Sequence, residues 1–348
     1  MSGKSSSDEI RFLTYNILQK CIGFQVTSCE YKSERMSIFT SQHINDFDIL
    51  CLQESFDYLN IRPYRLLQAA YKKGFHYFFR SAPPTLQSDF VSDGGLVILS
   101  RYPIVDAEEL VFPKSLKVDG YSQKGALFTK IDMGEGKILN VIDIHTQASY
   151  PFDVKEIQTG CLVNRVSQFV ELRKFIDRLL ESGRVDPNEL FMLVGDFNTD
   201  ALNRDFDWDE FYSHFEFDEK IFQKEAETEF DMLLNVLSYK AGFRLKNVYY
   251  SHNEEHPVTF GRFTIDENGT KRPTEVALTD ERELTSGMSL DYILEIIPNK
   301  RKGKTTKLYV KEKSAKTEEF LIKHEKLTQL SDHIGLSCIL TSAEPKKK

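Results

Sequence analysis

The sequence predicts one α/β domain with β-sheets at its centre, and three observations support this fold class. Short apolar runs of strand length recur from one end of the 348 residues to the other. Helix-like stretches lie between them, and no change of composition marks a linker in the middle of the chain. The hydrophobic share of 41% is enough for a sizeable core. We expect a single domain over residues 10–342, after a flexible N-terminus (1–9) and before a basic tail (343–348).

The predicted strands are apolar runs bounded by polar or turn-forming residues. In chain order they are Ile10–Leu18, Asp48–Leu52, Gly95–Ser100, Ala126–Ile131, Ile138–Ile144, Leu190–Val194, Leu290–Ile296, Lys307–Lys311 and Gly335–Leu340. The first run alternates in polarity, which places Ile10, Phe12, Thr14 and Asn16 on one face.

The clearest predicted helix runs from Leu162 to Leu180. Its apolar residues follow helical spacing: Leu162, Val166, Phe169, Ile176 and Leu179. Gly183 supplies a C-terminal stop. We expect the polar residues of this segment to lie mostly off the buried stripe: Arg165, Gln168, Arg173 and Lys174.

Three segments read as insertions into the domain. The segment near 203–231 is acidic and aromatic, and its spacing favours packing on the domain over contact with a membrane interface. The segment near 252–287 is polar and loop-like. The segment near 300–326 is lysine-rich and is interpreted as a hairpin that projects into solvent.

The charge and the cysteines exclude some classes of function. A net charge of −8 disfavours broad electrostatic binding to nucleic acid, which needs a basic surface. The five cysteines are an odd number and spread widely, so they predict neither a disulfide framework nor a zinc site. Cys21 and Cys29 are spaced so that they can pair, although spacing alone is weak evidence.

The N-terminus lacks the apolar stretch of a signal peptide, and no apolar run approaches the roughly 18 residues that span a bilayer. We therefore expect a cytoplasmic or peripheral membrane protein. Secretion remains the alternative if a leader has been trimmed.

Three polar motifs stand beside predicted strands and carry the chemistry. Asp332 and His333 are adjacent, and an Asp beside a His can hold the imidazole as a general base. The Gly195-Asp196-Phe197-Asn198 turn places a carboxylate and an amide at a strand end. Glu54 follows another strand and offers the carboxylate oxygen that a hard metal ion prefers. Together these motifs indicate metal-assisted hydrolysis of a phosphate ester.

The chain resembles the endonuclease/exonuclease/phosphatase superfamily, and within it the magnesium-dependent neutral sphingomyelinases. The matching blocks occur in family order over nearly the whole chain: Phe12-Leu-Thr-Tyr-Asn16, Leu52-Gln-Glu54, Gly94 to Ile104, Lys124-Gly125, His145-Thr-Gln-Ala148, Arg165-x-x-Gln168, Gly195-Asp-Phe-Asn198, Leu290-Asp-Tyr-Ile293 and Ser331-Asp-His333. The resemblance implies a four-layer α/β sandwich of the DNase I-like type, with two central mixed β-sheets flanked by helices. Thr146 departs from the family, which usually has an apolar residue there.

The resemblance also implies roles for the site residues. Glu54 is the principal Mg²⁺ ligand, with Asn16 as a polar neighbour of the metal and Mn²⁺ as a substitute ion. His333 deprotonates the attacking water, and Asp332 orients its ring. Asp196 positions the water or the phosphate.

The remaining roles concern the phosphate and the support of the site. Asn198 donates to a phosphate oxygen, and His145 contacts the phosphate opposite His333. Asp291 supports the histidine or the metal. Lys124 either binds the phosphate or pairs with Asp119 to order a loop beside the site.

The reaction implied is hydrolysis of sphingomyelin to ceramide and phosphocholine by a monomer in peripheral contact with a membrane, without nucleic acid. A nuclease on the same scaffold is the first alternative, and the acidic charge and the His145 block disfavour it. An inositol phosphate phosphatase is the second, but its Trp-x-Gly-Asp and Trp-Cys-Asp-Arg motifs are missing. A non-catalytic lipid-binding or scaffold protein is the third, and it has no need for all of the polar motifs.

Overall fold

The computed structural model describes residues 9–20, 31–85, 87–113, 115–150, 153–204, 226–299 and 306–344. Several expectations lie wholly or largely outside these residues: the flexible N-terminus, the Cys21–Cys29 pair, most of the aromatic insertion, the start of the lysine-rich insertion and the end of the basic tail. Among the helices of the described residues, none combines the length and the apolar composition needed to cross a bilayer.

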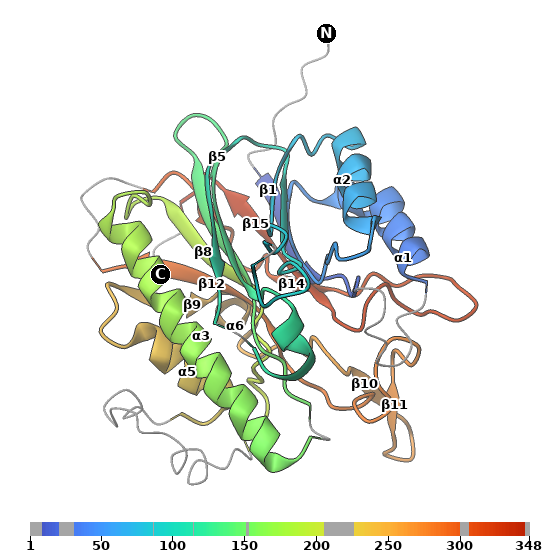
Figure 1. The fold of residues 1–348 in the computed structure, drawn as a ribbon. Coiled ribbons are helices and arrows are strands. Elements are labelled where there is room, and N and C mark those ends of the chain that lie inside the picture. The colour runs from blue at the N-terminus through green and yellow to red at the C-terminus, as the bar shows by residue number, and fades with distance from the viewer. Residues whose placement is uncertain are drawn as a thin grey trace.

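Two mixed β-sheets form the centre of the molecule (Figure 1). The first sheet has the order β13 (Tyr309–Val310), β15 (Gly335–Thr341), β1 (Glu9–Asn16), β2 (Ile49–Gln53), β4 (Val97–Ser100) and β3 (Tyr77–Arg80), and β14 (Lys316–Glu318) also pairs with β15. The second sheet has the order β5 (Ile104–Val111), β6 (Gly125–Asp132), β7 (Ile138–His145), β8 (Leu190–Asp196), β12 (Asp291–Pro298) and β9 (Phe243–Asn247). The pairs β1–β2 and β7–β8 are parallel, and the other pairs are antiparallel.

Helices cover the outer face of each sheet. The principal helices are α1 (Lys32–Ile38), α2 (Arg62–Lys72), α3 (Lys155–Glu181) and α5 (Glu229–Ser238). Shorter turns are η1 (Phe39–His43), η2 (Ile44–Asp46), η3 (Lys117–Tyr121) and α6 (Val248–Asn253), and a small ribbon pairs β10 (Phe263–Ile265) with β11 (Lys271–Pro273). Figure 1 shows α1 and α2 on one side of the sheets and α3 and α5 on the other.

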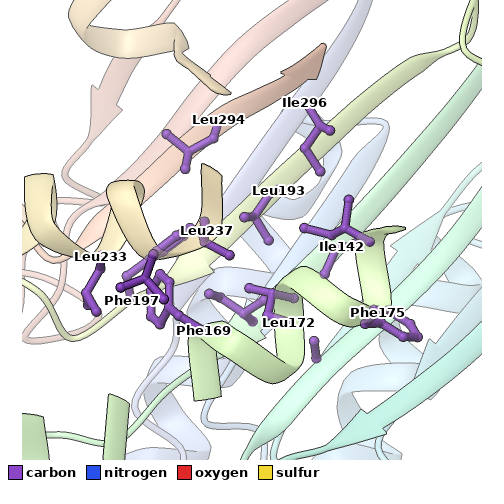
Figure 2. Close-up of a cluster of buried hydrophobic side chains, with 14 of the residues drawn as sticks. Ile142, Phe169, Leu172, Phe175, Leu193, Phe197, Leu233, Leu237, Leu294 and Ile296 are labelled. Atoms are coloured by element: carbon purple, nitrogen blue, oxygen red, sulfur yellow. The ribbon is translucent and has the colours of Figure 1, made fainter. Parts of the chain in front are cut away.

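Three hydrophobic clusters separate the layers. Side chains of α1 and α2 pack on one face of the first sheet, and side chains of both sheets pack between them. Side chains of α3 and α5 cover the outer face of the second sheet, where Phe169, Leu193 and Leu237 meet (Figure 2). Burial on both faces explains the continuous apolar runs of the central strands. The predicted four-layer sandwich is confirmed.

The long helix α3 confirms the predicted apolar stripe and corrects the polar face. Leu162, Val166, Phe169, Ile176 and Leu179 are buried, and Gly183 follows the helix with a φ of +74°. The helix begins earlier than predicted, at Lys155. Arg165 and Gln168 were expected off the buried stripe, but both are buried, because they bond to the loop that follows β7.

The pairing of the strands brings polar strand ends from both sheets to one edge. In the first sheet Asn16 pairs with Gln53, at the ends of the parallel strands β1 and β2. In the second sheet Asp196 lies between His145 and Asp291 on its two neighbouring strands. The carboxyl ends of parallel strands meet at one edge, so this edge positions the candidate site.

Candidate active site

Asp196 is the point on which the polar residues of both sheets converge. Its Oδ2 accepts a hydrogen bond from Asn16 Nδ2 at 3.0 Å. The same oxygen lies 3.5 Å from His145 Nε2 and 3.7 Å from His333 Nε2. All four side chains are buried. Three of the predicted site residues therefore surround a fourth, although they come from distant parts of the chain.

Burial raises the pKa of the Asp196 carboxyl to about 6, although the charge of His333 opposes this shift. The local backbone also aims the side chain: Asn198 N donates to Asp196 Oδ1 at 2.9 Å. Gly195 precedes it with a φ of +127°, and a Cβ there would lie 2.2 Å from the carbonyl oxygen of Ile144. Only glycine allows β7 and β8 to approach this closely.

His333 is held by Asp291 and not by Asp332. His333 Nδ1 lies 2.9 Å from Asp291 Oδ2, whereas Asp332 Oδ1 lies 3.2 Å from Ser331 Oγ. The prediction that Asp332 orients the ring is therefore wrong. Asp332 lies in a bend of the backbone and its carboxylate lies beside the Ser331 hydroxyl, so adjacency in the sequence does not bring it to the ring. Asp291 reaches the ring from β12.

Burial acts to lower the pKa of His333, but the charges of Asp291, Asp196 and Asp332 raise it to about 10. The hydrogen bond to Asp291 acts in the same direction. The imidazolium form of His333 is thus strongly favoured by its surroundings. The contact with Asp291 keeps the ring oriented while it carries the charge, and the ring can act as a base only in its neutral form.

Glu54 is a second carboxylate with an open coordination position. It follows β2 with a φ of +60°, and its Oε1 accepts a bond from Asn16 Nδ2 at 3.2 Å. Within the part of the chain that the structure describes, Glu54 Oε2 is buried and meets no hydrogen-bond donor. Burial acts to raise the pKa of Glu54, but Lys20, Lys124 and His333 lower it below its usual value. The group is therefore an ionised carboxylate with one unused buried oxygen.

Asn16 joins the two carboxylates. Its Nδ2 donates to both Glu54 and Asp196, while its Oδ1 accepts a bond from Leu18 N at 3.1 Å. In this arrangement Asn16 orients the carboxylates and does not turn its oxygen toward them.

His145 and Lys124 form a third part of the site. Lys124 Nζ lies 2.8 Å from His145 Nε2 and donates to Thr146 O at 2.9 Å. Burial, with the positive charges of Lys124 and His333, lowers the pKa of His145 well below its usual value. The ring is therefore neutral, and its Nε2 accepts a hydrogen bond from Lys124 Nζ. His145 Nδ1 is buried and has no partner among the described residues.

The predicted Asp119–Lys124 pair forms, with Asp119 Oδ1 3.2 Å from Lys124 Nζ. Asp119 Oδ2 also accepts bonds from Gln147 Nε2 at 3.1 Å and from Ala148 N at 2.7 Å. The pair thus orders the loop after β7. Asn198 Nδ2 donates to Thr146 O at 3.1 Å, so its amide is bound to the same loop.

Thr146 has a visible role despite its departure from the family pattern. Its hydroxyl donates to Phe197 O at 2.5 Å, and its N donates to Asp196 O at 3.2 Å. The substitution adds a link between the loops after β7 and β8.

Sequence reasoning missed several supporting residues. Gln53 Nε2 donates to Asp143 Oδ1 at 2.6 Å, between the two sheets and beneath the site. Thr259 Oγ1 accepts bonds from Leu290 N and Asp291 N. The sequence does point to Asp143, since an acid inside the apolar run Ile138–Ile144 needs a buried hydrogen-bond partner. It does not point to Thr259.

Two groups of side chains offer ligands to a divalent cation. Asp196, Asp291 and His333 present ligand atoms within 4.8 Å of one another. Their atoms already contact one another, and the raised pKa of His333 places a positive charge among them. Glu54 instead has an ionised carboxylate with an unpartnered buried oxygen, the donor that Mg²⁺ prefers. The Glu54 side of the site therefore fits a cation better.

Comparison with known proteins agrees with this geometry. The family model described as Endonuclease/Exonuclease/phosphatase family matches residues 13–294. A sphingomyelinase from Dictyostelium discoideum is 27% identical over 354 residues, covering 88% of this chain and 75% of that protein.

Two solved structures share the fold. The crystal structure of sphingomyelinase C from Streptomyces griseocarneus matches with a TM-score of 0.60 at 19% identity, covering 96% of this chain and 99% of the other. A variant of beta toxin from Staphylococcus aureus with bound magnesium ions matches with a TM-score of 0.59 at 19% identity, covering 95% and 99%. The resemblance predicted from the motifs is confirmed, and the chain belongs to the endonuclease/exonuclease/phosphatase family.

Proposed function

We propose that this chain, a phosphodiesterase, hydrolyses sphingomyelin to ceramide and phosphocholine with the help of a divalent metal ion. One observation carries the proposal: His333, held by Asp291 beside Asp196, is linked through Asp196 and Asn16 to Glu54, whose Oε2 is buried and has no partner among the described residues. The similarity to a sphingomyelinase over most of the chain supports the choice of substrate.

In the proposed reaction the neutral form of His333 takes the proton from the attacking water. A cation at Glu54 would favour that neutral form, because a positive charge nearby lowers the pKa of an imidazole. Asp291 keeps the ring oriented and stabilises the imidazolium that forms. Asp196 lies beside His333 Nε2 and positions the water or the phosphate. Asp332 contributes negative charge near the ring without contacting it.

Glu54 would hold the metal ion, Mg²⁺ or its substitute Mn²⁺, through its open oxygen. Such an ion neutralises phosphate oxygens and favours departure of the leaving oxygen. Lys124 places a positive charge beside His145, and we assign both to the phosphate side of the site. Asn198 keeps its predicted role there as a donor.

Peripheral contact with a membrane is part of the proposal, because the scissile bond of a lipid lies at the bilayer surface. Exposed apolar side chains lie in the segments that follow strand ends at this edge of the sheets, and we propose that they form a rim: Leu59, Ile61, Tyr64, Val91, Leu116, Val118, Tyr121 and Val154. Hydrogen bonds join some of these segments, since Val91 N donates to Tyr121 O and Leu116 N donates to Gln147 Oε1 in the loop after β7. We propose that the protein is a monomer and contacts the lipid through this rim. A cytosolic site of action stays a prediction from the sequence.

The test is release of phosphocholine from sphingomyelin vesicles with Mg²⁺, and then with excess EDTA. Duplex DNA with an abasic site serves as the control substrate. We expect release that depends on the metal and no cleavage of DNA. Cleavage of DNA without release of phosphocholine would overturn the substrate and favour the nuclease alternative.

A further inference from the structure

Arg35 is a buried arginine that takes no part in the proposed chemistry. It lies in the last turn of α1 and is 1% exposed. Its Nη1 donates to Ile17 O at 3.1 Å and to Leu330 O at 2.6 Å, and its Nη2 donates to Leu18 O at 2.7 Å. One side chain therefore binds backbone that follows β1 and backbone that precedes β15.

The first of these segments belongs to the Glu54 half of the site. Leu18 N donates to Asn16 Oδ1, and Gln19 N donates to the carbonyl oxygen of Glu54 at 3.0 Å. A shift of this segment would move Asn16, which binds both Glu54 and Asp196.

The second segment belongs to the His333 half. Leu330 precedes Ser331, whose hydroxyl donates to Asn16 O at 2.7 Å and accepts a bond from His333 N at 3.3 Å. The ladder between β1 and β15 pairs its last residues at Thr14 and Leu336. Beyond that pair, Arg35 and Ser331 connect the two halves.

The chemistry of arginine suits this task. Burying a charge is costly, so a buried guanidinium needs several good acceptors. Its planar fork can bind three carbonyls in fixed directions, whereas a lysine presents a single nitrogen on a flexible stem. A residue needed only to fill space would more often be apolar.

We propose that Arg35 is a positioning residue that fixes the spacing between the Asn16–Glu54 half and the Asp332–His333 half of the site. The inference rests on the proposed function for its substrate, but not for its geometry. Displacing reacting groups by about 1 Å can cost about 10²-fold in rate. We therefore expect Arg35 to act on kcat and not on KM.

The test compares Arg35→Lys with Arg101→Lys. Arg101 also binds backbone carbonyls, those of Phe47 and Lys73, but at the opposite end of β2 from Glu54. Kinetics are measured on sphingomyelin vesicles and on bis(p-nitrophenyl) phosphate, a soluble diester. Melting temperature and Mn²⁺ affinity are measured on the same samples. If the wild type cleaves the soluble diester alone, the lipid substrate fails while Arg35 remains testable.

We expect Arg35→Lys to lower kcat about 100-fold with KM unchanged, and Arg101→Lys to keep wild-type kcat at a similar melting temperature. Wild-type kcat in a folded Arg35→Lys protein would overturn the proposal. So would equal losses in both variants, because they would reflect stability alone.

Ser331→Ala keeps the test decisive if Arg35→Lys does not fold, since it removes a single hydroxyl that bonds to Asn16, Asp332 and His333. We expect a loss of kcat there as well, with Mn²⁺ affinity weakened. When both variants fold, their effects on kcat should be less than multiplicative. Unchanged kcat and Mn²⁺ affinity in Ser331→Ala would contradict the proposal.

Discussion

At the scale of single residues, Asp291 and Asp332 offer a direct comparison. Both are buried acids near His333, but only Asp291 contacts its ring. We predict that Asp291→Asn lowers kcat by about 10²–10⁴-fold, the usual contribution of an oriented general base. Asp332→Asn should cost about 10-fold or less, since it removes charge near the ring and no contact. Steady-state kinetics on vesicles measure both, and a larger loss in Asp332→Asn would reverse the assignment.

Substitutions of Glu54 and of His333 should differ in their effect on metal affinity. His333→Ala is expected to abolish turnover and to leave Mn²⁺ binding near that of the wild type, because the metal is assigned to Glu54. Glu54→Gln keeps the shape of the side chain but removes the charge, so Mn²⁺ affinity should fall along with turnover. Titration calorimetry with Mn²⁺ distinguishes the two. Unchanged Mn²⁺ affinity in Glu54→Gln would move the metal to Asp196, Asp291 and His333.

Asp93 is not one of the reacting groups, and its titration should make the free energy of unfolding depend on pH. Burial and the charge of Asp57 raise its pKa to about 7, although Arg80 opposes the shift. An unfolded Asp titrates near a pKa of about 3.9. Between these values the folded protein keeps a proton that the unfolded chain has lost. The contribution of Asp93 to the free energy of unfolding therefore falls as pH rises from about 4 to about 7.

Asp93→Asn removes this titration. We expect its melting temperature, relative to wild type, to rise between about pH 5 and about pH 8. Calorimetry of both proteins at the two values checks this. A difference that does not vary with pH would show that Asp93 is ionised in the folded protein throughout.

At the scale of elements, the contact between β7 and β8 depends on Gly195. A methyl group at this position would meet the carbonyl oxygen of Ile144 and would also require a φ of +127°. Gly195→Ala should cost more than about 3 kcal/mol, while Gly134→Ala, at a φ of +81° with open space around it, should cost about 1 kcal/mol. Denaturant unfolding measures both. Equal costs would show that the strands can separate at no great expense.

The elements also show what sequence patterns predict and what they do not. Central strands such as β7 and β8 are buried on both faces, so their apolar runs predicted them almost to the residue. The edge strands β3 and β5 were missed, because partial exposure lets polar residues such as Glu108 and Glu109 interrupt the apolar pattern. The predicted range of α3 starts too late, at Leu162, because the first turns of the helix carry few apolar residues.

The site residues also fall into those that sequence patterns identify and those that they do not. Motifs at strand ends identified Glu54, His145, Asp196 and His333, since chemistry at an edge follows directly from strand order. The contact between Asp291 and His333 joins separate strands, and that of Arg35 with Leu330 joins distant segments. Neither can be read from sequence neighbours. A pattern along the chain therefore favoured Asp332, the nearer acid in sequence, over Asp291, the nearer acid in space.

At the scale of the whole molecule, the rim should separate binding to vesicles from chemistry. Replacing Leu59 and Ile61 by serine removes two exposed apolar side chains beyond the Glu54 strand end. Val105 is also exposed, but β5 begins at the end of the sheet remote from the site, so Val105→Ser is the control. We expect the double variant to lose about 10-fold or more in vesicle binding, from the apolar area withdrawn.

Cleavage of bis(p-nitrophenyl) phosphate should stay at the wild-type level in the same double variant. Sedimentation with sphingomyelin vesicles measures binding, and absorbance measures the soluble reaction. If vesicle binding is equal in all three proteins, the membrane contact lies on another surface.

The site lies at the shared edge of the two sheets because both sheets supply its residues. Asn16 and Glu54 come from the first sheet, while His145, Asp196 and Asp291 come from the second. The cluster packed between the sheets fixes their separation. The reaction proposed for this shared edge is attack by water on phosphorus.

Hydrolysis of sphingomyelin vesicles in H₂¹⁸O with Mg²⁺, followed by mass spectrometry of both products, tests that requirement most directly. We predict one ¹⁸O atom in the phosphate of phosphocholine and none in the hydroxyl of ceramide. Label in ceramide would place the attack on carbon and contradict the mechanism. Absence of both products would contradict the assigned reaction.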